Sequence, residues 1–452
     1  MRDKLSIVCL VGVFSLGLFF TFYKLSESPV TWMDEGLITQ TSRNLALQGH
    51  YAIQTSPGEY VSPGFITTSY PVTFPIALSY KILGVGLLQA RTVMAMYILL
   101  LFVLAYLLIR KHASGRIALL SLALLVTFAP IYGHGKNVLG EVPGLVYLLA
   151  ALLIFDNPWS GLFFGLAVAT KPIFLLVLPA IAVVFLIQKK RPSRIFVASL
   201  VAPILLWILV QFPHDSIGNI FSIYTNPHST NLWLSIGDNV GRFVSEAQPI
   251  YALILLVLWL AAITLRLYRR EKISSAELVA ATFSVLVYLA YLRTIGYYRY
   301  FFLGEMLALM YLPISLFSLA TIKFKFLHAR VPPLIVGGLV LAQLFQTVTH
   351  SWVVDGYDSY RTRDLSVALS RIGAAQLVYV YNAPELINFL PSNNYMQYAK
   401  VTDTIILGES TMPTLQTGKP DIVLAHFRDS SMPLLGWYKT RVKVDDYVIM
   451  EK

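Results

Sequence analysis

The chain is poor in charge and nearly lacks cysteine. Charged residues make up only 13% of its 452 residues, and Cys9 is the single cysteine. One thiol has no partner within the chain, so an internal disulfide framework is excluded. So little charge, with 56% hydrophobic residues and a mean hydropathy of +0.65, excludes an ordinary soluble domain. These shortages predict a chain that exposes much apolar surface to lipid.

The sequence also lacks the charge distribution of a nucleic-acid-binding protein, although its net charge is +11. Sixteen of the 35 Lys and Arg residues lie on very short loops at alternate ends of the apolar runs. Nine others are spread over much longer connecting segments before residue 350. This is the positive-inside pattern of a membrane protein. It predicts a cytoplasmic N-terminus and an extracytoplasmic C-terminal part in a cell membrane, with anionic lipids rather than nucleic acid as partners.

Apolar runs of near membrane-spanning length are abundant. They predict a polytopic α-helical membrane protein with about 11 transmembrane helices, at residues 5–23, 91–109, 117–132, 141–156, 160–170, 173–187, 195–212, 250–265, 277–292, 306–320 and 331–349. No small-residue cleavage site follows the first run, so we expect it to remain as an uncleaved signal anchor.

Three segments are too polar for the membrane interior. Residues 24–88 and 213–249 form long outer loops, and loops of such length usually carry function. Residues 351–452 predict a small α/β domain on the outer face. Its elements are strands at 377–381 and 421–425, a short helix at 383–390 and a hairpin at 438–450. We therefore expect a transmembrane domain at 1–350 and an extracytoplasmic domain at 351–452.

Two adjacent carboxylates, Asp34 and Glu35, follow the first apolar run in the sequence Trp32-Met33-Asp34-Glu35. A carboxylate beside a membrane is costly unless it is solvated, paired or used. The spacing Thr31-x-x-Asp34 also fits a capping box, in which Asp34 only satisfies backbone donors at a helix start. From spacing alone, a functional site and a helix cap are equally favoured as the role of Asp34.

Three features in order along the chain resemble the GT-C membrane glycosyltransferases, and in particular the protein O-mannosyltransferases and the bacterial lipid A aminoarabinose transferases. The features are Asp34-Glu35 with residues 43–46 and 49–51, the run 70–75 leading to 84–91, and residues 140–143 followed by 165–172 and 178–179. The resemblance covers about residues 1–350. It implies a GT-C fold and transfer of one sugar from a polyprenyl-phosphate carrier to an acceptor at the outer face.

The resemblance also implies roles for individual residues. Asp34 would be the general base of an inverting transfer, because a lipid phosphate leaves as an anion and needs no acid. Glu35 would orient a helix or the acceptor, or be solvated. Arg299 and Lys136 would bind the donor phosphate, with Glu141 as a supporting acid.

Each of these assignments has a structural alternative. Arg299 lies among Tyr297, Tyr298 and Tyr300, and an interfacial aromatic belt with a snorkelling arginine fits that pattern equally well. An ordinary ion pair between Lys136 and Glu141 is slightly favoured over phosphate binding.

Further cations lie in the outer segments. Arg91 and Arg293 are further phosphate candidates, whereas Lys171 is expected only to end a span. No residue spacing typical of a metal site is present, so no metal site is predicted. A divalent cation on Asp34, Glu35 and Glu141 is left open as the only cofactor.

Two other classes of function compete with the glycosyltransferase. A lipid or polysaccharide transporter or flippase would place polar groups near the bilayer midplane, and the predicted spans carry almost no charge. A surface-polysaccharide polymerase or ligase shares the multispan architecture but uses a diphosphate-linked donor. The sequence does not define the sugar, nor whether the acceptor is protein, lipid or glycan.

Overall fold

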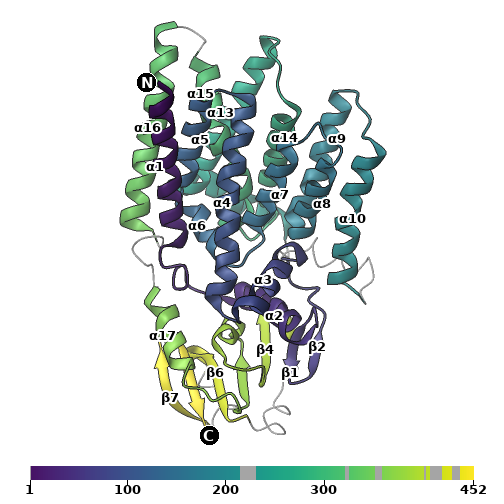
Figure 1. Cartoon of the computed structure of the whole chain (residues 1–452), viewed down its shortest axis with the longest axis vertical. Coiled ribbons are helices and arrows are strands. Elements are labelled where there is room, and N and C mark those ends of the chain that lie inside the picture. Colours follow the sequence, from purple (N-terminus) through teal and green to yellow (C-terminus); the bar gives the residue numbers. More distant parts are fainter. Residues whose placement is uncertain are drawn as a thin grey trace.

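The apolar segments form a bundle of helices, and the polar C-terminal part forms a sheet at one end of it (Figure 1). In this computed structural model the described residues are 2–213, 231–320, 325–351, 359–401, 404–407, 420–429 and 438–452. The N-terminus lies at the end of the bundle remote from the sheet, and the C-terminus lies in the sheet domain.

The predicted spans appear as helices in the expected order. Those long and apolar enough to cross a membrane are α4 (Leu87–His112), α10 (Arg194–Gln211), α13 (Ala247–Tyr268), α15 (Phe302–Ala320) and, from Arg330 onward, α16 (Lys325–His350). The pair α5 (Gly115–Val126) and α6 (Ala129–Lys136) passes the same test as one span bent by 62°. Pro130 in the first turn of α6 cannot continue a preceding helix, which accounts for the bend.

The remaining predicted spans are shorter apolar helices. They are α1 (Arg2–Phe22), α7 (Glu141–Leu153), α8 (Ser160–Thr170), η1 (Pro172–Leu176) with α9 (Val177–Ile187), and α14 (Ser275–Tyr291). The polytopic helical fold is thus confirmed, whereas the exact number of membrane crossings stays a prediction.

Small residues let the short helix α8 pack closely against α10. A Cβ atom on Gly161 would lie 2.2 Å from the carbonyl oxygen of Phe196, and one on Gly165 would lie 2.4 Å from that of Leu200. This Gly-x-x-x-Gly spacing is typical of helix pairs in membranes, where van der Waals contact drives association. The close contact fixes α8, whose last residue precedes Lys171 of the candidate site.

The first outer segment contains more regular structure than the sequence predicts. Helices α2 (Met33–Gln48) and α3 (Tyr70–Leu83) both lie within the predicted outer loop 24–88. Pro71 in the first turn of α3 suits a helix start at Tyr70, because its missing N–H would be unpaired there anyway. The hairpin of β1 (Ile53–Ser56) and β2 (Glu59–Val61) between these helices is not predicted.

In the described residues, the C-terminal sheet has six strands in the order β5-β4-β3-β6-β8-β7. Its strands are β3 (Val378–Tyr381), β4 (Tyr395–Val401), β5 (Thr404–Leu407), β6 (Ile422–His426), β7 (Lys439–Val444) and β8 (Tyr447–Glu451). The central strand β3 runs parallel to β4 and β6, and the outer pairs are antiparallel. Side chains that alternate along β3 form two apolar cores: Val378 and Val380 face one, Tyr379 and Tyr381 the other.

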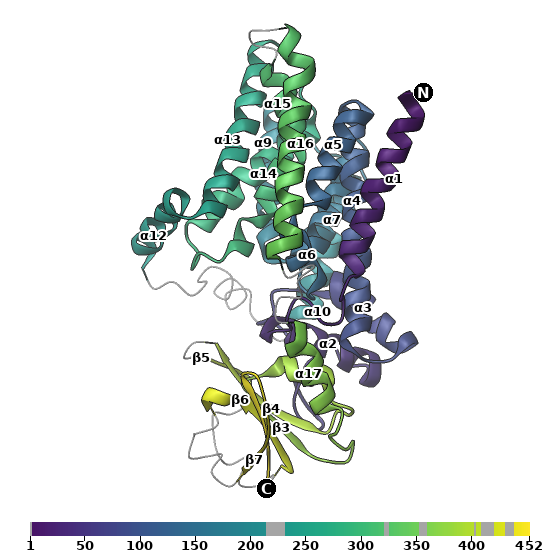
Figure 2. The same ribbon diagram turned by 90° about the vertical axis from the view of Figure 1, so that its left-hand side faces the viewer.

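The sequence identifies the central part of this domain. Both single strands and the terminal hairpin are confirmed, and the helix expected at 383–390 is the 3-10 helix η3 (Pro384–Phe389). Helix α17 (Ser359–Leu369) and strands β4 and β5 are not predicted. Turned by 90°, the sheet domain is seen to lie against α2, at the end of the bundle that carries α3 and α10 (Figure 2).

Two short elements complete the part near the sheet. Helix α12 (Leu232–Ser245) occupies the second predicted outer segment, of which residues 214–230 lie outside the described part. The 3-10 helix η2 (Tyr298–Tyr300) links α14 to α15.

Candidate functional site

Asp34 lies in the first turn of α2 but does not cap it. The N-cap residue is Trp32, which makes no side-chain capping bond. The Thr31 hydroxyl is buried without a hydrogen-bond partner, so the reciprocal bonds of a capping box are not formed. The capping-box alternative for Asp34 is therefore wrong, and its carboxylate is available for another contact.

That contact is an ion pair with Arg299. The Asp34 Oδ2 atom lies 2.5 Å from Arg299 Nη1 and accepts a hydrogen bond from it. The Asp34 side chain is 38% exposed, whereas that of Arg299 is 16% exposed. Asp34 is thus the more exposed member of the pair, and Arg299 is the more buried one. The predicted base and the first-choice phosphate ligand are in direct contact.

Aromatic rings surround the Arg299 guanidinium. Its Cζ atom lies 4.9 Å from the ring centre of Trp32, 5.6 Å from that of Tyr297 and 5.4 Å from that of Tyr300. Such rings attract a cation and hold the planar group in place. Arg299 is therefore held against Asp34, rather than extended towards an interface as a snorkelling arginine would be.

Burial and nearby carboxylates shift the pKa of Arg299 in opposite directions. Burial lowers its pKa, but the Asp34 and Glu141 carboxylates outweigh burial and raise the pKa above the ordinary value. The Nε atom of Arg299 is buried and has no hydrogen-bond partner. The group is thus a permanent cation whose donors are not all used by the protein.

Glu35 faces away from solvent, opposite to the prediction that it could be solvated. Both its side chain and that of Arg91 are fully buried, and two hydrogen bonds of 2.9 and 2.7 Å join them. The Val138 backbone N–H and the Asn137 side chain complete this cluster at Glu35 Oε1 and Arg91 Nη2. Glu35 ties the start of α2 to α4, which agrees with its predicted role in orienting a helix and leaves it no access to substrate.

The prediction that Lys136 pairs with Glu141 is wrong. Lys136 Nζ instead donates to the carbonyl oxygen of Tyr23 over 2.8 Å, and its residue is fully buried. Glu141 pairs with Lys171 over 2.5 Å, because the start of α7 meets the residue that follows α8. Lys171 therefore does more than end a span. Lys136 is held inside the fold, which gives no support to its predicted role as a phosphate ligand.

A network missed by the sequence analysis holds η2 in place. Glu305, fully buried at the start of α15, accepts hydrogen bonds of 2.6 Å from both Tyr298 and Gln248. The Tyr298 ring also packs against His134, with ring centres 5.4 Å apart. Tyr298 directly precedes Arg299, so these contacts fix the backbone that carries the cation. The sequence feature that could have revealed this network is the carboxylate at residue 305, close to the run of tyrosines and arginine at residues 297–300.

The C-terminal domain also positions α2. A Cβ atom on Gly36 would lie 2.4 Å from the backbone nitrogen of Glu385, so only glycine permits this contact. Two turns further along α2, Arg43 donates to the carbonyl oxygens of Ile387 and Leu390 over 2.8 and 3.2 Å. The helix that carries Asp34 is therefore held between the bundle and the sheet domain.

No group of three or more His, Cys, Asp or Glu residues is placed to hold a metal ion in the described residues. The three carboxylates considered for a divalent cation each face a different cation: Arg299 for Asp34, Arg91 for Glu35 and Lys171 for Glu141. Their arrangement gives no support to a shared metal site.

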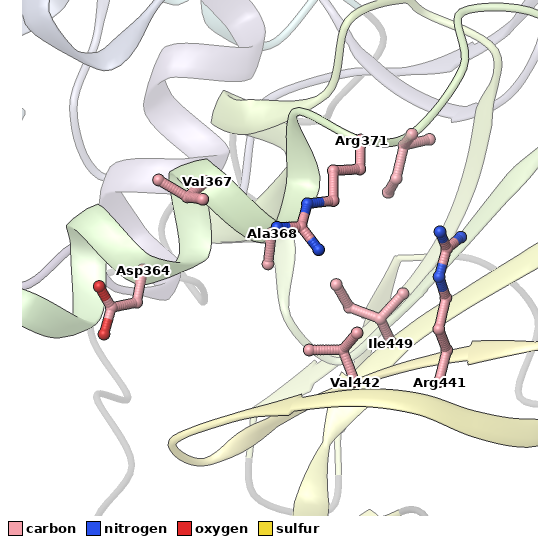
Figure 3. Close-up of a pocket in the computed structure, with 8 residues that line it drawn as sticks. Asp364, Val367, Ala368, Arg371, Arg441, Val442 and Ile449 are labelled. Atoms are coloured by element: carbon pink, nitrogen blue, oxygen red, sulfur yellow. The ribbon is translucent and has the colours of Figure 1, made fainter.

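A cavity of about 220 Å³ lies in the sheet domain, apart from these residues (Figure 3). It lies between α17 and the β7–β8 hairpin, with Arg371 and Arg441 at its rim and Val442 and Ile449 on its floor. None of the predicted site residues lines it. The catalytic assignments therefore rest on the Asp34–Arg299 pair and not on this cavity.

Comparisons with known proteins bear on this arrangement. The model of glycosyltransferase family 87 matches residues 67–294. No curated protein gives a significant match.

Solved structures share the fold at low sequence identity. One is ArnT from Cupriavidus metallidurans bound to undecaprenyl phosphate, with a TM-score of 0.67, 14% identity, and coverage of 98% of this chain and 97% of ArnT. The same enzyme in the apo state gives a TM-score of 0.62 at 13% identity, covering 100% and 98% of the two chains. The Archaeoglobus fulgidus oligosaccharyltransferase tethered to an acceptor peptide gives 0.52 at 12% identity, covering 97% of this chain and 72% of that one. These matches confirm a GT-C type membrane fold with a small C-terminal sheet domain.

Proposed function

Since this chain belongs to glycosyltransferase family 87, we propose that it transfers a single sugar from a polyprenyl-phosphate carrier to an acceptor. The reaction takes place at the outer face of the membrane and inverts the configuration of the anomeric carbon. Support for the carrier comes from ArnT, whose structure of the same fold holds undecaprenyl phosphate. The acceptor is a hydroxyl of a protein, lipid or glycan.

The contact between Asp34 and Arg299 carries this proposal. An inverting transfer needs a base at the attacking hydroxyl and a cation at the leaving phosphate. During the reaction the base and the cation lie on opposite sides of the anomeric carbon, so the ion pair has to open when the donor binds. Asp34 and Arg299 supply one of each and are brought together from residues 265 apart in the chain.

The pair has the right exposure for its two roles. The more exposed Asp34 faces an incoming acceptor, and the covered Arg299 faces the donor phosphate. When the donor phosphodiester binds, its negative charge competes with Asp34 for the guanidinium. Release from Arg299 frees the carboxylate to accept the proton of the acceptor hydroxyl. Donor binding therefore exposes the base in the same step that engages the leaving group.

The bond changes balance without an additional reactant. The acceptor oxygen forms a bond to the anomeric carbon, and its proton passes to Asp34. The bond from the anomeric carbon to the phosphate oxygen breaks, and its electron pair leaves with the polyprenyl phosphate. The product phosphate carries one more negative charge than the phosphodiester, and Arg299 is placed to stabilise it.

The topology follows from the charge pattern and the position of the site. We place the N-terminus in the cytoplasm and the C-terminal part outside the cell membrane. Residues 1–350 form the transferase domain, and residues 351–452 form an outer domain that holds α2. Helix α2, which carries Asp34, lies at the bundle end that meets the sheet domain (Figure 2), so in this topology the Asp34–Arg299 pair is on the outer side.

The function is tested in proteoliposomes loaded with radiolabelled polyprenyl-phosphate monosaccharides and an envelope extract as acceptor. The expected result is cleavage of the sugar–phosphate bond and transfer of the label into the acceptor fraction. Movement of intact labelled carrier between leaflets without cleavage would contradict the proposal and favour a flippase. Consumption of a diphosphate-linked oligosaccharide in place of the monophosphate donor would favour a polymerase or ligase.

A further inference from the structure

Helix α12 packs one face against the protein and leaves an apolar stripe exposed. Asn239 and Phe243 face the bundle, and Asn239 is buried. On the other side, Trp233, Val240 and Val244 are 79%, 49% and 77% exposed. Together with Gly237 these residues follow each other at spacings of four, three and four residues, which places them on one stripe. Asp238 and Ser245 lie together on another, more polar side of the helix.

The inner face of α12 is anchored by polar contacts to the segment that precedes η2. The Asn239 side-chain amide donates to the carbonyl oxygens of Tyr291, Leu292 and Thr294, at 2.7–3.2 Å. Arg242 Nη1 donates to the carbonyl oxygen of Gly296 over 2.6 Å. These bonds fix the helix, so its exposed stripe has a defined direction.

Gly296 allows this anchoring. Its φ of +84° lies in the region that side chains other than glycine rarely adopt. A Cβ atom there would also lie 2.6 Å from Asn239 Oδ1 and from the Arg242 guanidinium carbon. The α12 anchor therefore depends on a glycine only three residues before Arg299.

We propose that α12 lies in the outer interface of the lipid bilayer, with Trp233, Gly237, Val240 and Val244 inserted among the acyl chains. Only Glu246 separates α12 from α13, a helix long and apolar enough to cross the membrane. The side of α13 that carries Ile254 and Val257 is also exposed. The apolar stripe of α12 thus continues a surface that faces lipid, and an amphipathic helix at the end of a span lies flat in the interface. Figure 2 shows α12 at the side of the bundle, near the sheet-domain end of α13.

The bilayer contact has a consequence for the Asp34–Arg299 site. This consequence rests on the proposed function. The bonds from Asn239 and Arg242 connect the lipid-facing helix to the backbone that leads into η2. A polyprenyl carrier arrives from the same lipid phase, so α12 orients Arg299 at the depth where the carrier phosphate lies. Loss of the lipid contact then weakens donor capture more than the chemical step.

Single-cysteine fluorescence tests the position of α12 without reference to activity. The full chain with Cys9→Ser receives either Val244→Cys or, as the matched control on the polar side of the same helix, Asp238→Cys. Each is labelled with nitrobenzoxadiazole and reconstituted into phosphatidylcholine–phosphatidylglycerol liposomes. Val240→Cys serves in place of residue 244 if that variant does not fold.

The expected result is a blue-shifted probe at residue 244 that shallow doxyl-labelled lipid quenches and aqueous iodide does not. The probe at residue 238 is expected to show the reverse. Equal iodide quenching at the two positions would overturn the proposal, because α12 would then lie in water.

Kinetics separate this inference from the proposed function. Val244→Asp is expected to raise the KM for the polyprenyl-phosphate donor several-fold with little change in kcat. If no donor is consumed by the parent protein while the probe at residue 244 reports lipid, the proposed function fails and the bilayer contact stands. If the KM is unchanged in an active Val244→Asp variant, the link from α12 to donor capture fails.

Discussion

Asp34 and Arg299 are 265 residues apart in sequence, yet a 2.5 Å hydrogen bond joins their side chains. One residue opens the helix after the first apolar run, and the other precedes a late membrane helix. Fixing them together requires the Glu35–Arg91 pair on one side, the Glu305 network on another, and the docking of the sheet domain on α2. Each of these supports can be removed separately.

Replacing Arg299 by lysine is expected to lower kcat/KM for the donor about 10²- to 10³-fold, the usual effect of losing one preorganised donor to developing charge. Lysine keeps the charge but cannot reproduce the planar fork of hydrogen bonds or the stacking on three rings. Steady-state transfer kinetics measure the change. Arg116→Lys, an exposed cation at the start of α5, is the matched control and should leave the kinetics unchanged. Unchanged kinetics in Arg299→Lys would contradict the role given to the guanidinium, because they would show that the site needs only a positive charge at this position.

Replacing Glu35 by glutamine is expected to destabilise the protein by about 3–5 kcal/mol, because the fully buried Arg91 charge loses its carboxylate. Thermal unfolding of the purified protein in detergent measures the loss. Arg441→Gln breaks an ion pair with Glu451 that is exposed to solvent, and should change stability by less than about 1 kcal/mol. A Glu35→Gln variant as stable as the Arg441→Gln control would refute the structural role given to Glu35.

Replacing Gly36 by alanine is expected to push the sheet domain away from α2. Its methyl group would meet the Glu385 backbone, which cannot move aside as a flexible side chain would. Overpacking of this kind costs about 1–3 kcal/mol. Limited proteolysis should then cut between the bundle and the sheet domain more rapidly, and transfer should slow. Gly12→Ala in α1, where no atom lies within 4 Å of the new methyl group, should change neither.

The sheet domain is expected to lose stability as pH rises towards neutrality. Burial raises the pKa of Glu385 to about 7, against which a hydrogen bond from Tyr447 acts only partly. The folded state therefore keeps a proton that the unfolded state releases near its ordinary pKa of 4.5. The stabilisation is fully present below pH 4.5, declines between pH 4.5 and 7, and is constant above that range.

A shift of this size corresponds to about 3 kcal/mol. Glu385→Gln should remove that part of the pH dependence, so melting curves of parent and variant between pH 4.5 and 8 measure it by difference. His426 Nε2 lies 3.7 Å from Glu385 Oε1 and is left unchanged in both proteins. Parallel pH profiles in the two proteins would contradict the assignment.

The sequence predicted the helices because each one depends on its own residues. Long apolar runs need lipid or a core around them, and basic residues at alternate ends order them across the membrane. The same locality explains the confirmed strands β3 and β6, whose residues are buried on both faces of the sheet. Strand β4 was missed because polar residues interrupt it, and strand β5 was missed because it is only four residues long; pairing with neighbours rather than composition defines both.

Pairings between distant residues could not be predicted in this way. Lys136 and Glu141 are five residues apart, and proximity in sequence favoured an ion pair between them. Packing instead brings Lys171 to Glu141 and turns Lys136 towards Tyr23. The sequence identified Asp34 and Arg299 separately, but only the fold brings their side chains together.

The most direct test of this account compares Asp34→Asn with the parent protein in two measurements on the same proteoliposomes. One is binding of the polyprenyl-phosphate sugar and the other is its transfer to the acceptor. Asparagine preserves the shape of the side chain and removes the base, so we expect donor binding to be retained or tightened as Arg299 is released. Transfer should be lost, while Asp156→Asn, an exposed carboxylate elsewhere, transfers normally. Full transfer by the Asp34→Asn variant would contradict the mechanism.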